Sequence, residues 1–289
     1  MNKTVLITGG AGFVGSNLCE YLVSLENYNI YSLDDYSTGS TSNHKKGVVY
    51  IKGSTKDIEK LIDFKPDLIY HLGEYSRVEQ SFSDIEKVVE SNISGTLRVL
   101  EFARKHKCKL VYAGSSTKFG DEFGGKIASP YAWTKSKNTE FVNRYAEWFG
   151  INYAITYFYN VYGKGEISKG KYATLIGIFK EKYTQGEKLT VVKPGTQKRN
   201  FTHIEDIVSA LYLVGEKGYG DGYGIGASKE YSVIEIAKMF GGEVDYLPER
   251  KGNRLGAELV CEKTYKLGWK AKYDIREHIE NFKKAHSNE

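Results

Sequence analysis

The sequence predicts an α/β protein in which a parallel sheet carries helices on both faces. Two observations lead to this prediction. Short runs rich in β-branched residues alternate with longer amphipathic segments through the first half of the chain, and a glycine-rich turn directly follows the first such run. Alternation of this kind is typical of a doubly wound, Rossmann-type sheet. The second half is more irregular and predicts a smaller C-terminal α+β lobe.

The elements of the first half follow from hydrophobic periodicity. Helical spacing of apolar residues predicts helices over 16–25, 84–106 and 131–149. Short apolar runs bounded by turn residues predict strands over 5–8, 30–34, 48–52, 68–72 and 110–113, and a further central strand over 153–158. We expect these strands to form one parallel sheet.

The second half predicts a separate lobe. Helices are expected over 174–185, 205–214 and 232–240, and short strands over 189–192 and 200–203. The segment 163–170 is rich in glycine and charge and marks a domain boundary. We therefore expect a dinucleotide-binding domain over residues 1–162, completed by a strand and a helix near 200–214, and a second lobe over 163–289.

Composition limits the classes of partner. Hydrophobic residues make up 40% and charged residues 27% of the chain, as in an ordinary soluble protein, and the net charge is a mild +5. Neither nucleic acid nor a membrane is indicated as a partner. Three widely separated cysteines, Cys19, Cys108 and Cys261, fit neither a disulfide framework nor a metal site. With no signal peptide or membrane-length apolar stretch in view, we expect a cytoplasmic location.

The glycine-rich turn predicts a dinucleotide site. Gly9, Gly12 and Gly15 are spaced as G-x-x-G-x-x-G between the first strand and the first helix. Such spacing allows a tight turn and close backbone approach to a pyrophosphate, which the helix N-terminus then stabilises. Asp34 and Asp35 end the second strand about 20 residues later, where a carboxylate can accept the ribose hydroxyls and repel a 2′-phosphate. NAD is therefore favoured over NADP.

A tyrosine and a lysine predict acid–base chemistry. Tyr131 and Lys135 are four residues apart at the start of a helix and so share one face. A free tyrosine is a poor base at neutral pH, but a nearby ammonium favours the phenolate form, which can take a proton from a hydroxyl. Ser115 and Ser116 end the preceding strand at the edge where doubly wound sheets bind ligands, and they can hydrogen-bond the reacting oxygen.

Nine motifs in order identify a family resemblance. The chain resembles the extended short-chain dehydrogenase/reductases, specifically the nucleotide-sugar epimerases and dehydratases of the UDP-glucose 4-epimerase type. The resemblance covers essentially the whole chain and is carried by TGGAGFVGS, LDDYSTG, HLGE, SNISGT, AGSSTKFG, YAWTK, FYNVYG, RNFTHIEDI and LGW. It implies that residues 163–289 bind a nucleotide-diphosphate sugar.

The resemblance also implies roles for individual residues. Tyr131 would be the base, Lys135 its partner and a ligand of the nicotinamide ribose, and Ser115 the hydroxyl donor, with Ser116 as the alternative. The cofactor site would comprise Gly9, Gly12, Phe13, Val14, Gly15, Asp34, Asp35, Ser54, Leu72, Gly73, Asn92, Lys135 and Phe158. The substrate site would comprise Glu74, Ser116, Asn160, Arg199 and Arg250, of which Asn160 and the two arginines hold the pyrophosphate. No metal site is expected.

Departures from the family pattern narrow the reaction. The 4,6-dehydratases carry an Asp-Glu pair where this chain has Ser116 and Thr117, and neither replacement can act as a carboxylic acid. We therefore expect an epimerase that inverts C4 of a nucleotide sugar through a 4-keto intermediate. The alternatives are a nucleotide-sugar dehydrogenase or reductase, an atypical 4,6-dehydratase that uses Glu74, and a non-catalytic NAD-binding module.

Other departures from the family pattern leave the identity of the substrate undetermined. Glu74 stands where the family has a small residue, and it could bind a substrate hydroxyl, act as a second acid or base, or pair with Arg77. Ser54 replaces an aspartate at the adenine, and Tyr157 replaces an arginine before the FYN segment. By analogy with the family, the helices predicted over 84–106 and 131–149 would join two copies in a homodimer.

Overall fold

The computed structural model describes residues 2–119, 129–249 and 256–286. Within these ranges, seven strands form one sheet in the order β11-β6-β5-β4-β1-β2-β3, and all neighbouring strands are parallel. The order reverses between β1 and β4, so ligands are expected outside the carboxyl ends of these two strands. The strands are β1 (Lys3–Thr8), β2 (Tyr28–Asp34), β3 (Val48–Lys52), β4 (Leu68–His71), β5 (Lys109–Ser115), β6 (Tyr153–Phe158) and β11 (Gly220–Ile225).

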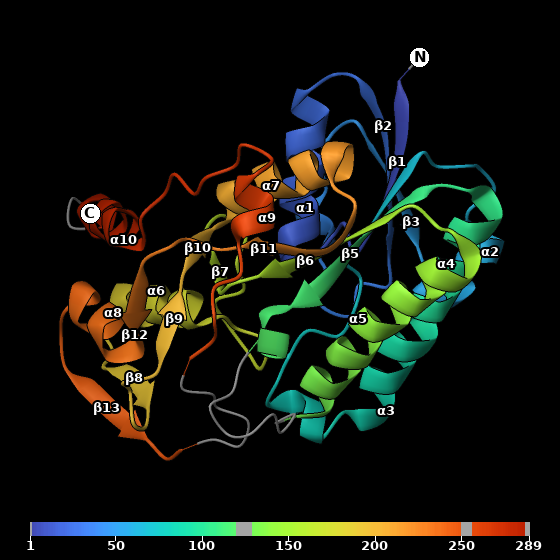
Figure 1. Cartoon of the computed structure of the whole chain (residues 1–289). Coiled ribbons are helices and arrows are strands. Elements are labelled where there is room, and N and C mark those ends of the chain that lie inside the picture. Colours follow the sequence, from blue (N-terminus) through green and yellow to red (C-terminus); the bar gives the residue numbers. More distant parts are fainter. Residues whose placement is uncertain (1, 120–128, 250–255, 287–289) are drawn as a thin grey trace.

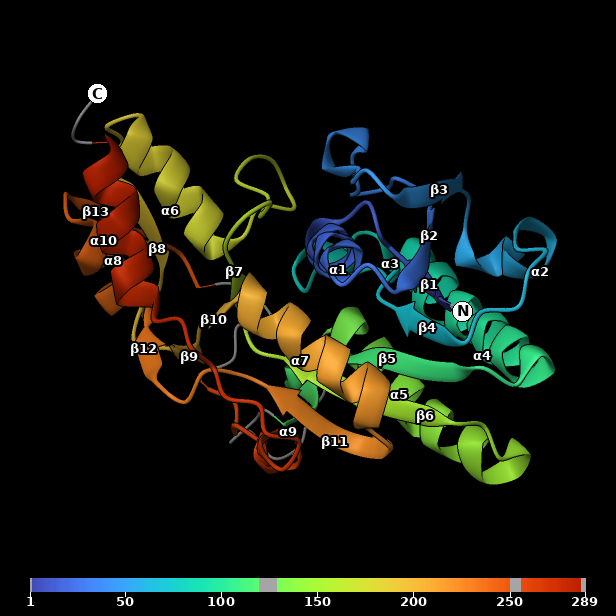
Figure 2. The ribbon, with the colours of Figure 1, turned by 90° about the horizontal axis from the view of Figure 1, so that it is seen from above.

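Helices cover both faces of the sheet. Figure 2 shows α1 (Phe13–Ser24) and α7 (Ile204–Lys217) on one face, and α4 (Gly95–His106) and α5 (Pro130–Phe149) on the other. Successive side chains of a strand point to opposite faces. Val5 and Ile7 accordingly pack in the core under α1 and α7, whereas Leu6 packs in the core under α4 and α5. The predicted doubly wound α/β fold is confirmed.

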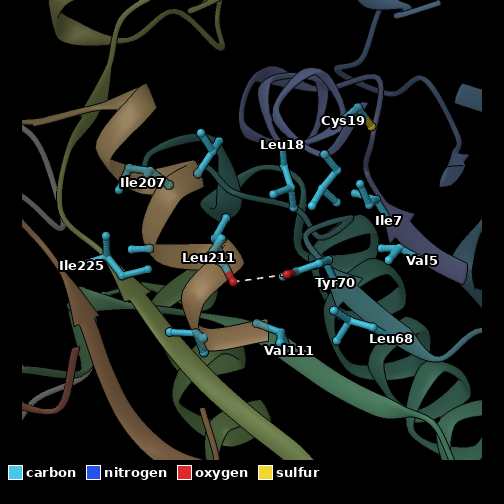
Figure 3. Packing of buried hydrophobic residues seen from close by; sticks show 14 of the residues in the cluster. Val5, Ile7, Leu18, Cys19, Leu68, Tyr70, Val111, Ile207, Leu211 and Ile225 are labelled. Atoms are coloured by element: carbon cyan, nitrogen blue, oxygen red, sulfur yellow. Dashed lines mark hydrogen bonds between the residues drawn. The ribbon is translucent and has the colours of Figure 1, made fainter. Parts of the chain in front are cut away.

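The core under α1 and α7 joins segments that are far apart in the sequence. Leu18 from α1 and Leu211 from α7 pack over strand residues that include Val111 and Ile225 (Figure 3). The hydroxyl of Tyr70 on β4 donates a hydrogen bond to the Leu211 carbonyl oxygen at 3.3 Å, which satisfies the polar end of a fully buried ring. Helix α7 therefore packs against the large sheet.

A smaller lobe lies beside the sheet and has its own core (Figure 1). Two parallel strands, β8 (Leu189–Val192) and β13 (Val244–Leu247), and two antiparallel strands, β9 (Lys198–Asn200) and β12 (Glu230–Ser232), form its small sheets. Its helices are α6 (Leu175–Thr184), α8 (Val233–Phe240) and α10 (Ile275–His286). The short strands β7 (Val161–Tyr162) and β10 (Thr202–His203) pair with each other, and α9 (Glu262–Tyr265) lies against β11.

Two elements differ from the sequence-based expectation. The strand expected over 200–203 divides between β9 and β10, and neither joins the large sheet, whose last strand is β11. The helix expected over 84–106 consists of the one-turn helix α3 (Ile85–Val88), a π-helical turn over Val89–Ser94, and α4. Hydrophobic periodicity does not separate a π-helical turn from the α-helices that flank it.

Two further findings concern the described residues alone. None of their helices combines the length and the apolar character that crossing a membrane requires. The three cysteines are buried free thiols, and burial raises the pKa of both Cys19 and Cys108 to about 12.

Candidate active site

A large cleft of about 1630 Å³ runs along the carboxyl ends of the strands, between the sheet and the smaller lobe. Its volume exceeds the usual 300–1,000 Å³ of a site for one small molecule, so a cofactor and a substrate fit together. The cleft brings together most of the residues predicted from the sequence: Gly9, Gly12, Phe13, Val14, Gly15, Asp34, Asp35, Ser54, Leu72, Gly73, Glu74, Ser115, Ser116, Tyr131, Lys135, Phe158, Asn160 and Arg199.

The glycine turn leaves no room for side chains. Gly9 has a φ of +74°, and a Cβ built there would lie 2.8 Å from the Cα of Gly73. A Cβ on Gly15 would lie 2.1 Å from the Gly9 carbonyl oxygen. Helix α1 begins at Phe13 with no side-chain cap, so its first N–H groups remain available beside the cleft. This arrangement fits the pyrophosphate of a dinucleotide.

Asp34 lies at the end of β2, beside the glycine turn. Its Oδ2 accepts a hydrogen bond from the Ala11 N–H, and its Oδ1 accepts one from the Tyr36 N–H, each at 2.8 Å. Burial raises the pKa of the Asp34 carboxyl above its ordinary value, against the opposing effect of these two N–H groups. Each carboxylate oxygen can accept further hydrogen bonds, so the ribose hydroxyls of NAD fit here. Asp35 is exposed and accepts from the Ser37 N–H at 2.9 Å.

Tyr131 and Lys135 lie in the first turns of α5. Ser129 caps this helix by accepting from the Ala132 N–H at 3.1 Å, and Pro130 occupies its first position. The cap fixes where the helix begins and therefore where Tyr131 enters the cleft. The Lys135 ammonium donates to the Ala113 carbonyl oxygen on β5 at 2.6 Å, which ties α5 to the end of that strand.

Ser115 and Ser116 lie where β5 ends, and both line the cleft. The Ser115 Oγ accepts hydrogen bonds from the Thr117 hydroxyl at 2.9 Å and from the Thr117 N–H at 3.3 Å. Its own hydroxyl proton can still be donated to a reacting oxygen. Ser116 is 3% exposed and lines the same cleft. Either serine therefore remains a candidate for the hydroxyl donor.

Glu74 turns inward and binds Lys135. Its side chain is 1% exposed, its Oε2 forms an ion pair with the Lys135 ammonium, and its Oε1 accepts from Asn138 and Thr96. Pairing with Arg77, one of the three expected roles, is not what the structure shows. The Arg77 guanidinium donates instead to the carbonyl oxygen of Tyr172.

The side chains that donate hydrogen bonds to Glu74 were not predicted from the sequence. Asn138 could have been found, because it lies three residues after Lys135 and therefore on the same face of α5. Thr96 on α4 and Tyr112 on β5 are brought to Glu74 by tertiary packing alone. No local pattern in the sequence indicates those contacts.

Asn92 does not line the cleft. Its fully buried amide accepts from the Tyr75 N–H at 2.7 Å and donates to the Tyr75 carbonyl oxygen at 3.1 Å. A third hydrogen bond, 3.0 Å long, runs to the Thr134 hydroxyl. Asn92 therefore fixes the loop that follows β4, and its expected contact with the cofactor stays a prediction.

Two of the residues expected to bind substrate line the cleft between β6 and the smaller lobe. Asn160 has a φ of +33°, and its amide donates to the Asn200 carbonyl oxygen at 3.2 Å, which joins the end of β6 to β9. Arg199 lies on β9 and donates to the Lys198 carbonyl oxygen at 2.7 Å. Arg250, the remaining predicted substrate residue, lies outside the described residues.

The contacts of Asp34 lead to a prediction about cofactor choice. Asp34→Asn keeps the shape of the side chain but removes the charge that accepts ribose hydroxyls and repels a 2′-phosphate. We expect NAD affinity to fall about ten- to hundredfold and the preference for NAD over NADP to shrink. Isothermal titration calorimetry with both cofactors measures this. Asp35→Asn is the matched control, and a larger loss there than at Asp34 would contradict the assignment.

Comparison with known proteins places these features in a family. The model of the NAD dependent epimerase/dehydratase family matches residues 5–226. A putative UDP-glucose 4-epimerase of Methanocaldococcus jannaschii is 30% identical over 297 residues, covering 95% of this chain and 95% of that protein. The human dTDP-D-glucose 4,6-dehydratase is 30% identical over 311 residues, covering 96% of this chain and 88% of that protein.

A solved structure agrees with this result. The UDP-glucose 4-epimerase of Thermus thermophilus in complex with NAD matches with a TM-score of 0.88 at 25% identity, covering 97% of this chain and 99% of that one. The predictions of an enzyme and of NAD as its cofactor are confirmed, because the chain belongs to the NAD-dependent epimerase/dehydratase family.

Proposed function

We propose that this enzyme epimerises a nucleotide-activated sugar at C4 through a 4-keto intermediate. The observation that carries the proposal is the chemistry at the end of β5. Tyr131 and Lys135 line the cleft beside Ser116 and Thr117, which stand where the dehydratases have their Asp-Glu pair. Epimerisation needs hydride transfer and one proton, whereas elimination of water needs a further acid and base.

Overall similarity does not choose between the two reactions, because an epimerase and a dehydratase are both 30% identical to this chain. The contacts of Glu74 argue against an atypical dehydratase that would use this residue as its acid. Oε1 of Glu74 accepts hydrogen bonds from three side chains, and Oε2 is paired with Lys135. A carboxylate held in this way is poorly placed to give a proton to a leaving hydroxyl.

The residues of the cleft support the following mechanism. NAD, when bound, would supply the hydride acceptor and donor for the reacting sugar carbon. Tyr131 accepts the proton of the C4 hydroxyl and gives it back when the carbonyl is reduced. Ser115 or Ser116 donates a hydrogen bond to the same oxygen. The carbonyl oxygen of Ala113 holds the Lys135 ammonium in place next to these groups.

Inversion requires the keto sugar to present its other face while the nucleotide stays bound. We assign Asn160, Arg199 and, from the family resemblance, Arg250 to the pyrophosphate that must remain anchored. Arginine suits this role because its planar guanidinium pairs with two phosphate oxygens. Residues 163–289 would thus form the nucleotide-sugar lobe, apart from α7 and β11, which belong to the large sheet and its cover.

The proposal predicts a specific product. Incubation with UDP-glucose, UDP-N-acetylglucosamine and GDP-sugars should convert one of them to a stereoisomer, seen by NMR. Because the hydride is returned, the absorbance band of NADH should show no net change. A 4-keto-6-deoxy product would identify a dehydratase, and steady accumulation of NADH would identify a dehydrogenase.

The acid–base role of Tyr131 predicts that removing its hydroxyl group lowers kcat strongly. Tyr131→Phe should lower kcat by about 10²- to 10⁴-fold, because proton transfer loses its donor and acceptor. The measurement is the rate of epimer formation at saturating substrate. Tyr75→Phe is the control, because it removes a hydroxyl that lines the same cleft but bonds to Asp84. Turnover that survives in Tyr131→Phe would refute the acid–base role of Tyr131.

We also propose a homodimer formed through α4 and α5. Large apolar side chains are exposed on these helices and on the turns before α4, namely Ile85, Val89, Leu97, Trp133, Trp148 and Phe149. Exposed apolar surface of this kind is typical of a protein contact. Tyr145 is buried in the core instead, and Phe141 packs against it.

The dimer proposal predicts the effect of two charges at this surface. Leu97→Glu combined with Trp148→Glu should shift the sedimentation coefficient from that of a dimer to that of a monomer. Tyr246→Glu places the same charge at an exposed aromatic residue of the smaller lobe and should leave the dimer intact. A wild-type protein that sediments as a monomer would rule out the dimer.

A further inference from the structure

Glu74 places a carboxylate in a buried polar cluster behind the cleft. It comes three residues after the end of β4, and its side chain is 1% exposed. Oε1 accepts hydrogen bonds from Asn138 at 2.7 Å, Thr96 at 2.8 Å and Tyr112 at 3.2 Å. Oε2 forms the ion pair with Lys135, whose side chain is 6% exposed. Four elements of the fold therefore meet at one carboxylate.

The other ionisable groups in this cluster are neutral at physiological pH. His71 lies against Thr96 at 3.0 Å and Thr8 at 2.7 Å, and burial lowers the pKa of His71 to about 4. Burial also raises the pKa of Tyr112 well above its ordinary value. Among the described residues of the cluster, the charges are thus those of Glu74 and Lys135, and they sum to zero.

One N–H group of the Lys135 ammonium can still donate a hydrogen bond to a ligand in the cleft. An ammonium has three N–H groups, and two of them are directed to Glu74 and to the Ala113 carbonyl oxygen. The third can serve a ligand in the cleft, which Lys135 lines. The lysine therefore offers a hydrogen bond to a ligand while its positive charge is offset from behind.

We propose that Glu74 offsets the charge of Lys135 so that the site does not disfavour NAD⁺ relative to NADH. The nicotinamide ring is cationic only in the oxidised form, so an uncompensated ammonium near it would disfavour NAD⁺ selectively. The inference rests on the proposed function, in which Lys135 lies at the nicotinamide ribose and each turnover begins by oxidising the sugar. In this role Glu74 is a positioning residue that acts through Lys135.

The ratio of two dissociation constants tests this proposal. Glu74→Gln keeps the shape of the side chain and removes its charge. We expect the Kd for NAD⁺ divided by the Kd for NADH to rise about five- to tenfold, on the basis of one unit charge acting across a partly screened site. Calorimetry with each cofactor gives the ratio without any turnover. Equal changes in both dissociation constants would show that Glu74 is only structural and would overturn the proposal.

Matched variants separate charge from packing. Thr96→Val removes one hydrogen bond to the same carboxylate without changing the charge, so the ratio should stay at the wild-type value even if both affinities fall. Glu74→Asp keeps the charge and should retain the ratio. If Glu74→Gln does not fold, the double variant Glu74→Gln with Lys135→Met replaces the whole buried pair, a change that proteins often tolerate.

The double variant completes the test. With both charges removed it should return to the wild-type ratio, and a ratio that instead favours NADH would refute the proposal. Failure of the proposed function is seen separately, in the product formed by the wild-type enzyme. A dehydratase or dehydrogenase product would refute epimerisation while leaving the cofactor ratios of the Glu74 variants to be judged on their own.

Discussion

The cleft depends on the close approach of three backbone segments at the carboxyl ends of β1 and β4. Gly9 and Gly73 are so near that a Cβ on Gly9 would lie 2.8 Å from the Gly73 Cα, and a Cβ on Gly15 would lie 2.1 Å from the Gly9 carbonyl oxygen. Side chains at these positions would push α1 away from the sheet. Because Leu18 of α1 packs in the core that α7 also covers, the same displacement would loosen that core (Figure 3). The cofactor site and the stability of the domain thus depend on one packing constraint.

A second constraint lies beneath the cleft, where polar groups are buried together. Ionised groups in a protein interior are tolerated only when they are paired and hydrogen-bonded. Glu74 and Lys135 meet that condition, and the Asn138 amide contributes by donating to Glu74 and, at 2.7 Å, to the Asn92 carbonyl oxygen. Asn92 in turn fixes Tyr75 in the loop after β4. This chain of contacts ties the loop to α5, so the position of Lys135 is set by the fold and not by the ligand.

Local patterns in the sequence predicted the six strands β1 to β6 and the helices α1, α4, α5 and α7, because each central strand is a short apolar run and each of these helices has an apolar face. They missed β11, in which Gly220, Gly222 and Gly224 resemble a loop. A Cβ on Gly224 would lie 1.9 Å from the Val260 carbonyl oxygen, so that glycine serves a distant segment that crosses the strand. The residues of the candidate site likewise divide into those that the sequence predicted and those that it did not. The glycine turn, Asp34 and the Tyr131–Lys135 pair were predicted from spacing, whereas Thr96 and Tyr112 reach Glu74 only through tertiary packing.

The buried pair also bears on which reaction suits the cleft. A dehydrogenase must bind NAD⁺ and release NADH in every turnover, so a site without a penalty on NAD⁺ hinders neither step. An epimerase has a stricter need, because the same cofactor molecule must take up the hydride and then give it back. Because NAD⁺ is the cofactor form both before the sugar is oxidised and after it is reduced again, removing a penalty on NAD⁺ stabilises both end states relative to the keto intermediate. It therefore favours return of the hydride over release of the keto sugar. The carboxylate of Glu74, which pairs with Lys135 at a position where the family resemblance implies a small residue, would therefore favour completion of the epimerisation over loss of the keto intermediate.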